Sequence, residues 1–157
     1  MVLNNFTKII IAITLPLTVG GIASYFTLKA IPTWYESLNA PSFKPPNWVF
    51  GPVWTILYIL MGYSFFLIWK LPENSERNKA CIAFILQLVL NFAWSFFFFY
   101  FKNIGLALLD ISVLFLCIVV MLLLFYKIKP AAAYINIPYL CWVSFALILN
   151  YAFFRLN

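Results

Sequence analysis

Five long apolar stretches dominate the sequence and restrict the folds that the chain can adopt. They span residues 9–28, 45–69, 80–101, 104–126 and 130–154. Only Asp110 places a charge inside one of them. A helix that crosses the hydrocarbon core of a bilayer needs about 20 predominantly apolar residues, whereas strands of a membrane β-barrel are about ten residues long and alternate in polarity. We therefore expect one all-α transmembrane domain, residues 1–157, built as a bundle of five membrane-spanning helices.

The composition agrees with an integral, multi-pass membrane protein. Hydrophobic residues make up 66% of the 157 residues and charged residues only 9%. The net charge is +6, but the ten Lys and Arg residues are spread along the chain and lie mostly at the ends of the apolar stretches, as membrane anchors do. We therefore expect membrane lipids, and not nucleic acid, as partners. With the N-terminus inside, six of these cations lie inside and four outside, which favours that orientation.

The segment between the first two apolar stretches is not an ordinary polar connection. Residues 34–54 read WYESLNAPSFKPPNWVFGPVW, with three tryptophans and four prolines. These apolar side chains predict that the segment folds back onto the bundle. Pro45 and Pro46 suit the first turn of the second helix, where an amide hydrogen is not needed. We expect Trp34 and Tyr35, together with the prolines, to form a lid at the mouth of the bundle.

Helix geometry separates the tryptophans by their depth in the membrane. Trp48 and Trp69 are 21 residues apart, which is about 31 Å along a helix and suits the two interfacial aromatic belts. Trp54, Trp94 and Trp142 instead fall about 9 to 20 Å below the side of the membrane that carries the lid. Three helices therefore bring polar-edged aromatic side chains to overlapping depths beneath the lid.

Polar residues share a helix face with two of these tryptophans. Gln87, Asn91 and Trp94 follow the spacing of one face of the third helix. On the fifth helix the same spacing is followed by Trp142, Ala146 and Leu149 or Asn150. Such polar groups are costly to expose to lipid tails, so this face should point into the bundle. Two interpretations stay open: the groups bond one another across helices, or they line a ligand cavity.

Several motifs, in the same order along nearly the whole chain, resemble the TspO/MBR family of translocator proteins (peripheral-type benzodiazepine receptors) and bacterial tryptophan-rich sensory proteins. They are WYESLNAPSFKPPNWVFGPVWTILYILMGY, QLVLNFAW, LALLD and IPYLCWVSFALILNYAFFR. The resemblance implies a five-helix homodimer in the bacterial cell membrane, or in the mitochondrial outer membrane of a eukaryote. It also implies a pocket on the lid side for porphyrins and isoquinoline or benzodiazepine-type drugs. The matching pocket positions are Tyr35, Pro45, Trp54, Asn91, Trp94, Trp142 and Ala146.

The resemblance allows more than one class of function. The interpretation that we favour is a binding protein for porphyrin-like tetrapyrroles that acts in their sensing or transport or in stress regulation. An alternative is an enzyme for light- and oxygen-dependent porphyrin degradation, with Trp54 and Trp142 as the redox-active catalytic groups. A second alternative is a sterol or lipid transporter. The fifth helix carries a weak sterol-binding motif, formed by Leu149, Tyr151 and Arg155. The other interpretation is an ordinary tyrosine of the membrane belt with an arginine at a helix end.

The chemistry open to the chain is limited by its residue types. There is no histidine, so imidazole cannot bind a haem iron or act as a base. We expect no metal site and no cofactor, and a porphyrin would be a ligand held by aromatic stacking and hydrogen bonds. Asp110 either contacts a proton or ligand or, as we favour, lies near a helix N-terminus and bonds to a neighbouring helix.

Overall fold

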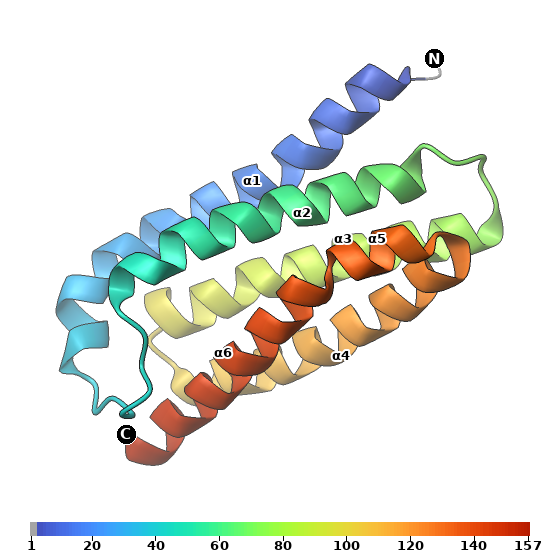
Figure 1. The fold of residues 1–157 in the computed structure, drawn as a ribbon. Helices are drawn as coiled ribbons and strands as arrows, with labels where there is room; N and C mark the ends of the chain where they lie inside the picture. The colour runs from blue at the N-terminus through green and yellow to red at the C-terminus, as the bar shows by residue number, and fades with distance from the viewer. Residues whose placement is uncertain (1–2) are drawn as a thin grey trace.

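The protein was analysed as a computed structural model, which describes residues 3–157 as a bundle of helices (Figure 1). The elements, in chain order, are α1 (Asn5–Ala30), α2 (Phe50–Trp69), α3 (Ser75–Ser95), α4 (Ile104–Ile128), α5 (Pro130–Ile135) and α6 (Ile137–Leu156). In the described part of the chain, five helical spans are long and apolar enough to cross a membrane, with α5 and α6 forming one of them. The predicted all-α bundle of five transmembrane helices is confirmed.

Asparagine side chains set the starts of three helices. The residue before α1, α3 and α4 is an asparagine, and its Oδ1 accepts a hydrogen bond from the backbone N–H three residues further on. Each of these caps satisfies one N–H that has no partner inside its helix. The caps lie outside the apolar stretches, so α1 and α3 begin four and five residues earlier than hydropathy alone indicates.

The first helix also ends later than expected. It continues beyond α1 as a π-helical turn, Ile31–Tyr35, so Trp34 and Tyr35 are helical residues and not part of a loop. The turn is held by packing, because Tyr35 is buried and Trp34 meets the ring of Phe98 edge to face at 5.2 Å. The prediction that these two aromatics lie in the connecting loop is therefore wrong, whereas their role as a lid stays a prediction.

The second helix begins later than expected. Pro45 and Pro46 precede it, and Pro46 has extended backbone angles (φ −56°, ψ 141°). A 3₁₀ turn, Asn47–Val49, follows and leads into α2. The prolines therefore end the loop and do not occupy the first turn of the helix, which corrects the prediction. Pro46 restricts Pro45 to an extended conformation, because the residue before a proline is disfavoured in helical geometry.

The fifth span is broken at Asn136, between α5 and α6. Pro138 is the second residue of α6 and has no amide hydrogen to donate to the preceding turn, so a new helix begins there. Asn136 is buried, and its Nδ2 donates to Ser64 Oγ on α2 and to the Ala132 carbonyl oxygen. The break is therefore fixed to α2 by hydrogen bonds.

Glycines allow α1 and α2 to approach each other closely. A Cβ atom on Gly62 would collide with the backbone of Ala12 and Ile13, and one on Gly20 would collide with the ring of Tyr58. Small residues at such crossings let two helix backbones pack by van der Waals contact in a membrane. These contacts hold α1 to the bundle along the middle of the helix.

Candidate ligand-binding site

A cavity of about 420 Å³ lies inside the bundle, at the end where the α1–α2 loop and the C-terminus meet (Figure 1). Residues of α1, α2, α3 and α6 line it, together with the π-helical turn Ile31–Tyr35 after α1 and a second one, Phe96–Tyr100, after α3. Pockets for drug-sized ligands have volumes of about 300–1,000 Å³ and mostly apolar walls. The cavity falls within that range.

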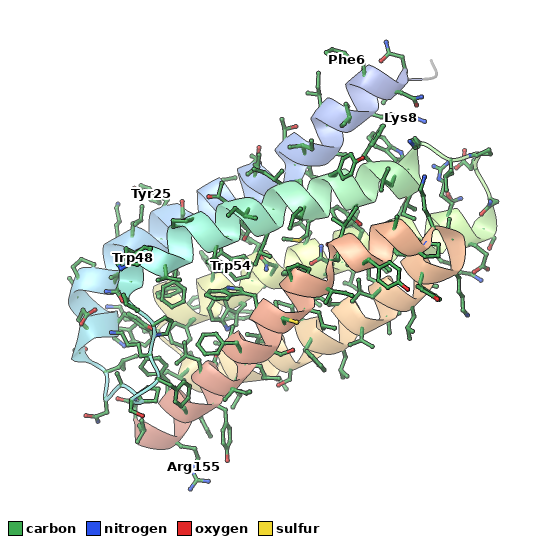
Figure 2. All side chains as sticks on the ribbon, viewed as in Figure 1. Phe6, Lys8, Tyr25, Trp48, Trp54 and Arg155 are labelled. Atoms are coloured by element: carbon green, nitrogen blue, oxygen red, sulfur yellow. The ribbon has the colours of Figure 1, made fainter. Side chains whose placement is uncertain are left out.

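Five of the seven predicted pocket residues line this cavity. They are Tyr35, Trp54, Trp94, Trp142 and Ala146. Figure 2 shows Trp54 inside the bundle and Trp48 at its edge beside the loop. Trp48 is 75% exposed, as suits an interfacial residue. The three tryptophans that depth separated from the aromatic belts therefore come together around one space, although ligand binding by them stays a prediction.

Asn91 and Pro45 do not line the cavity. Asn91 is buried beneath it, where Oδ1 accepts from the Tyr58 hydroxyl at 2.7 Å and Nδ2 donates to the Tyr139 oxygen at 3.1 Å. The Tyr139 hydroxyl in turn donates to Gln87 Oε1 at 2.7 Å. These bonds join α2, α3 and α6, so this polar face supports the cavity floor through bonds between helices, which is the first of the two interpretations.

Aromatic rings form the wall on the α2 and α6 sides. Trp54 stacks on Tyr58, with 5.4 Å between the ring centroids, and meets the edge of Tyr139 at 6.3 Å. Trp142 packs between Phe50 and Phe145, at 6.1 and 5.6 Å. Because Asn91 holds both tyrosines, the position of the Trp54 ring depends on the hydrogen bonds below it.

The indole N–H groups of Trp94 and Trp142 differ in their partners. Trp94 Nε1 donates to Asn150 Oδ1 at 2.9 Å, and Asn150 Nδ2 donates to the Ile104 carbonyl oxygen at 3.1 Å. Trp142 Nε1 is buried and has no hydrogen-bond partner within residues 3–157. A buried donor without a partner costs about 1–3 kcal/mol.

Polar contacts join the start of the loop between α1 and α2 to its end. Near its start, Glu36 Oε1 accepts from Asn47 Nδ2 at 2.6 Å and pairs with Lys44 Nζ at 3.2 Å, and we call these three residues the Glu36 clasp. The hydrogen bond from Asn47, and then the contact with Lys44, lower the pKa of the Glu36 carboxyl from its ordinary value. Lys44 Nζ also lies 4.5 Å from the ring centre of Tyr35, a cavity residue.

The middle of the loop is fixed to the end of α6. Asn39 N donates to Asn157 Oδ1 at 2.9 Å, and Asn157 Nδ2 donates to the Asn39 carbonyl oxygen at 3.1 Å. Phe43 meets the edge of Phe145, a cavity residue, at 6.4 Å. The loop therefore folds back onto the bundle, as its composition indicates.

The residues of the proposed sterol motif do not form one surface. Leu149 is buried and lines the cavity, whereas Tyr151 is exposed and accepts a 3.4 Å hydrogen bond from Arg155 Nη1. Arg155 points away from the bundle (Figure 2). The pair has the arrangement of a belt tyrosine beside an arginine that reaches toward the membrane surface.

Asp110 does not line the cavity, and one oxygen of its side chain lacks the hydrogen bond that we expected. The residue is only 7% exposed, and its Oδ2 atom has no hydrogen-bond partner in the described part of the chain. The bond to a neighbouring helix that we expected is therefore not made by this oxygen.

The α1 side of the cavity was missed by sequence reasoning. Leu17, Gly20, Gly21 and Ser24 line it. None is aromatic, and the only polar side chain, that of Ser24, donates its hydroxyl to the Gly21 carbonyl oxygen of its own helix. Within residues 3–157, no three His, Cys, Asp or Glu side chains gather in a way that could hold a metal ion.

Five membrane-spanning helices around an aromatic cavity define an integral, multi-pass membrane protein with an internal site of ligand size. The TspO/MBR family model matches residues 12–156, and the chain belongs to this family. The tryptophan-rich protein TspO of Archaeoglobus fulgidus is 38% identical over 154 residues, covering 98% of this chain and 99% of the relative. That of Chlorobaculum tepidum is 40% identical over 151 residues, 94% of each chain. The human translocator protein is 39% identical over 127 residues, 79% of this chain and 75% of the relative.

Proposed function

We propose that the protein binds flat aromatic ligands of the porphyrin class in the cavity and acts in tetrapyrrole sensing or transport. The observation that carries the proposal is the buried Trp142 N–H without a partner, set in a wall of aromatic rings. Aromatic faces stack on a flat ligand, and an indole N–H that already lies out of water gains a full hydrogen bond when the ligand supplies an acceptor. Isoquinoline and benzodiazepine-type drugs share this chemistry.

Charge at the loop end supports the same ligand class. Lys44 lies over the ring of Tyr35 at the end of the cavity, with its ammonium group paired to the exposed Glu36. A propionate of a porphyrin would replace Glu36 as the partner of Lys44, at little cost because exposed ion pairs contribute little. With no histidine in the chain, iron ligation by imidazole has no part in the binding.

Tryptophan quenching tests the proposal. Protoporphyrin IX is titrated into the full chain in detergent micelles, and we expect saturable quenching for the wild type. Trp142→Phe keeps an aromatic ring but removes the donor, so we expect an affinity loss of about fivefold to tenfold, which corresponds to one hydrogen bond of about 1–1.5 kcal/mol. Trp48→Phe is the matched control, because Trp48 lies outside the cavity and is exposed. Equal affinities for the wild type and Trp142→Phe would contradict the proposal.

A second candidate is light- and oxygen-dependent porphyrin degradation. It is favoured by the stacking of Trp54 on Tyr58 in the cavity wall, because stacked electron-rich rings can donate an electron to a photoexcited porphyrin. Illumination of the complex in air, followed by chromatography of the pigment, separates the two functions. Product that forms with the wild type and is lost in Trp54→Phe, while binding is retained, favours the enzyme. A pigment that stays intact favours the binding protein.

A further inference from the structure

The α1 helix is the least enclosed of the membrane spans. Its most apolar window is 17% buried, against 33–44% for the other four spans. It packs on α2 and α3, and its contacts with α2 are tightest where Gly62 meets the Ala12 backbone and where Gly20 meets the Tyr58 ring. Gly20 and Tyr58 also line the cavity. Gly20 and Tyr58 therefore mark the depth at which α1 and α2 come into contact beneath the cavity.

Above that level the two helices face each other with small residues. Gly21 and Ser24 on α1, and Gly51 and Thr55 on α2, all line the cavity, and all four are exposed. A Cβ atom added at Gly21 or Gly51 would meet no atom within 4 Å. Exposed wall residues on two neighbouring helices, with open space at both glycines, point to an opening in that wall.

The edges of this opening suit lipid and not water. The Ser24 hydroxyl donates to the Gly21 carbonyl oxygen at 2.8 Å, and the Thr55 hydroxyl donates to that of Gly51 at 2.9 Å, so both hydroxyls are satisfied within their own helices. Beside them, Leu28 and Ile56 are 68% and 58% exposed. An apolar molecule can pass such an edge without leaving a buried polar group unpaired.

The loop end of the cavity, in contrast, is held shut. Tyr35 is buried among Phe98, Phe99 and Phe153 at that end. The loop over it is fixed by the Glu36 clasp and by the hydrogen bonds of Asn39. Access from water therefore requires several contacts to break, whereas access from the bilayer requires none of them to break.

We propose that the gap between Gly21, Ser24, Gly51 and Thr55 is a lateral portal, through which ligands reach the cavity from the membrane leaflet on the loop side. The proposal rests on the proposed function and narrows its ligand class. The ligands are flat, apolar molecules that dissolve in the bilayer and carry an acceptor for the Trp142 N–H. Porphyrins that carry many charges and stay in water are excluded from this route.

Binding kinetics in vesicles test the portal. The full chain is reconstituted in phosphatidylcholine vesicles and mixed with vesicles that contain protoporphyrin IX dimethyl ester, a neutral porphyrin, and quenching is followed in time. The variants are Gly51→Phe and Gly21→Phe, one on each side of the gap. We expect the association rate to fall by about tenfold or more, because a phenylalanine side chain in the gap raises the barrier to entry. Ala131→Phe adds the same side chain at an exposed position of α5 and should leave the rates unchanged.

Each outcome either supports or overturns the lateral portal. Unchanged rates in both glycine variants overturn the portal while leaving the proposed function intact, and so does a weakened Kd with an unchanged association rate. Faster binding in Asn157→Ala, which removes both hydrogen bonds between the Asn157 side chain and the Asn39 backbone, assigns access to the loop end and also overturns the portal. If the wild type shows no saturable quenching, the proposed function fails and the portal fails with it. Thermal unfolding confirms that each variant is folded, and either glycine variant alone suffices for the test.

Discussion

Replacing Asn91 by leucine distinguishes a structural amide from a ligand contact. Asn91 is 2% exposed, lies below the cavity and makes two hydrogen bonds, from the Tyr58 hydroxyl and to the Tyr139 oxygen. Leucine has a similar volume and cannot form either bond. It leaves the Tyr58 hydroxyl without an acceptor, whereas the Tyr139 hydroxyl keeps Gln87 as its own acceptor.

The cost follows from these contacts. Hydrogen bonds between membrane helices contribute on average about 0.6 kcal/mol and at most about 1.7 kcal/mol each. A buried hydroxyl left without a partner adds about 1–3 kcal/mol. The two contributions are not simply added, because the measured value of a hydrogen bond already includes part of the cost of the partner left unpaired. We therefore expect Asn91→Leu to lower the free energy of unfolding by about 1–3 kcal/mol.

The assay is unfolding of the full chain in mixed micelles, followed by far-UV circular dichroism. Tyr58→Phe removes the donor that Asn91→Leu would leave unpaired, so the double variant should be less destabilised than the sum of the two single variants. Affinity for protoporphyrin IX should change less than in Trp142→Phe. Unchanged stability together with a tenfold or greater loss of affinity, which is about 1.4 kcal/mol, would refute the reasoning and make Asn91 a ligand contact.

Two further predictions concern the α1–α2 crossing and the loop. Gly62→Leu should destabilise the protein by about 1–3 kcal/mol or prevent folding, because the side chain would collide with the α1 backbone, whereas Gly21→Leu meets open space and should unfold like the wild type in the same micelle assay. The Glu36 clasp should open in acid. The pKa of Glu36 is lowered in the folded protein, so the contribution of the clasp is present above the unfolded carboxyl pKa and is lost as the pH falls through the folded value. Hydrogen exchange of residues 38–46, corrected for intrinsic rates, should therefore increase on acidification in the wild type and show no such step in Glu36→Gln; equal profiles would contradict the role of the clasp.

The class of fold could be predicted from the sequence because it depends on local composition. Each of the five spans is apolar over its own length, and no distant residue is needed to recognise it. The depth of Trp54, Trp94 and Trp142 could also be predicted, since the rise along a helix is constant. These three side chains do meet around one cavity.

Helix ends and side-chain partners could not be predicted in the same way. Tyr35 looked like a loop residue until its burial against Phe98 and Phe153 showed that packing extends the first helix. Asn91 matched the spacing of the cavity face, yet two tyrosines from other helices take its hydrogen bonds. Both outcomes depend on rotations between helices, which periodicity within one helix does not contain.

The sequence by itself therefore determined a five-span membrane protein of the TspO/MBR family and singled out the three tryptophans that meet around its cavity. Only the tertiary structure decided that the Trp94 N–H has a hydrogen-bond partner and that the Trp142 N–H has none among residues 3–157. It also decided that glycines on α1 and α2 line the cavity. The physical reason is that hydropathy acts along a single chain segment, whereas hydrogen bonding and steric fit depend on which side chains of other helices arrive at the same place.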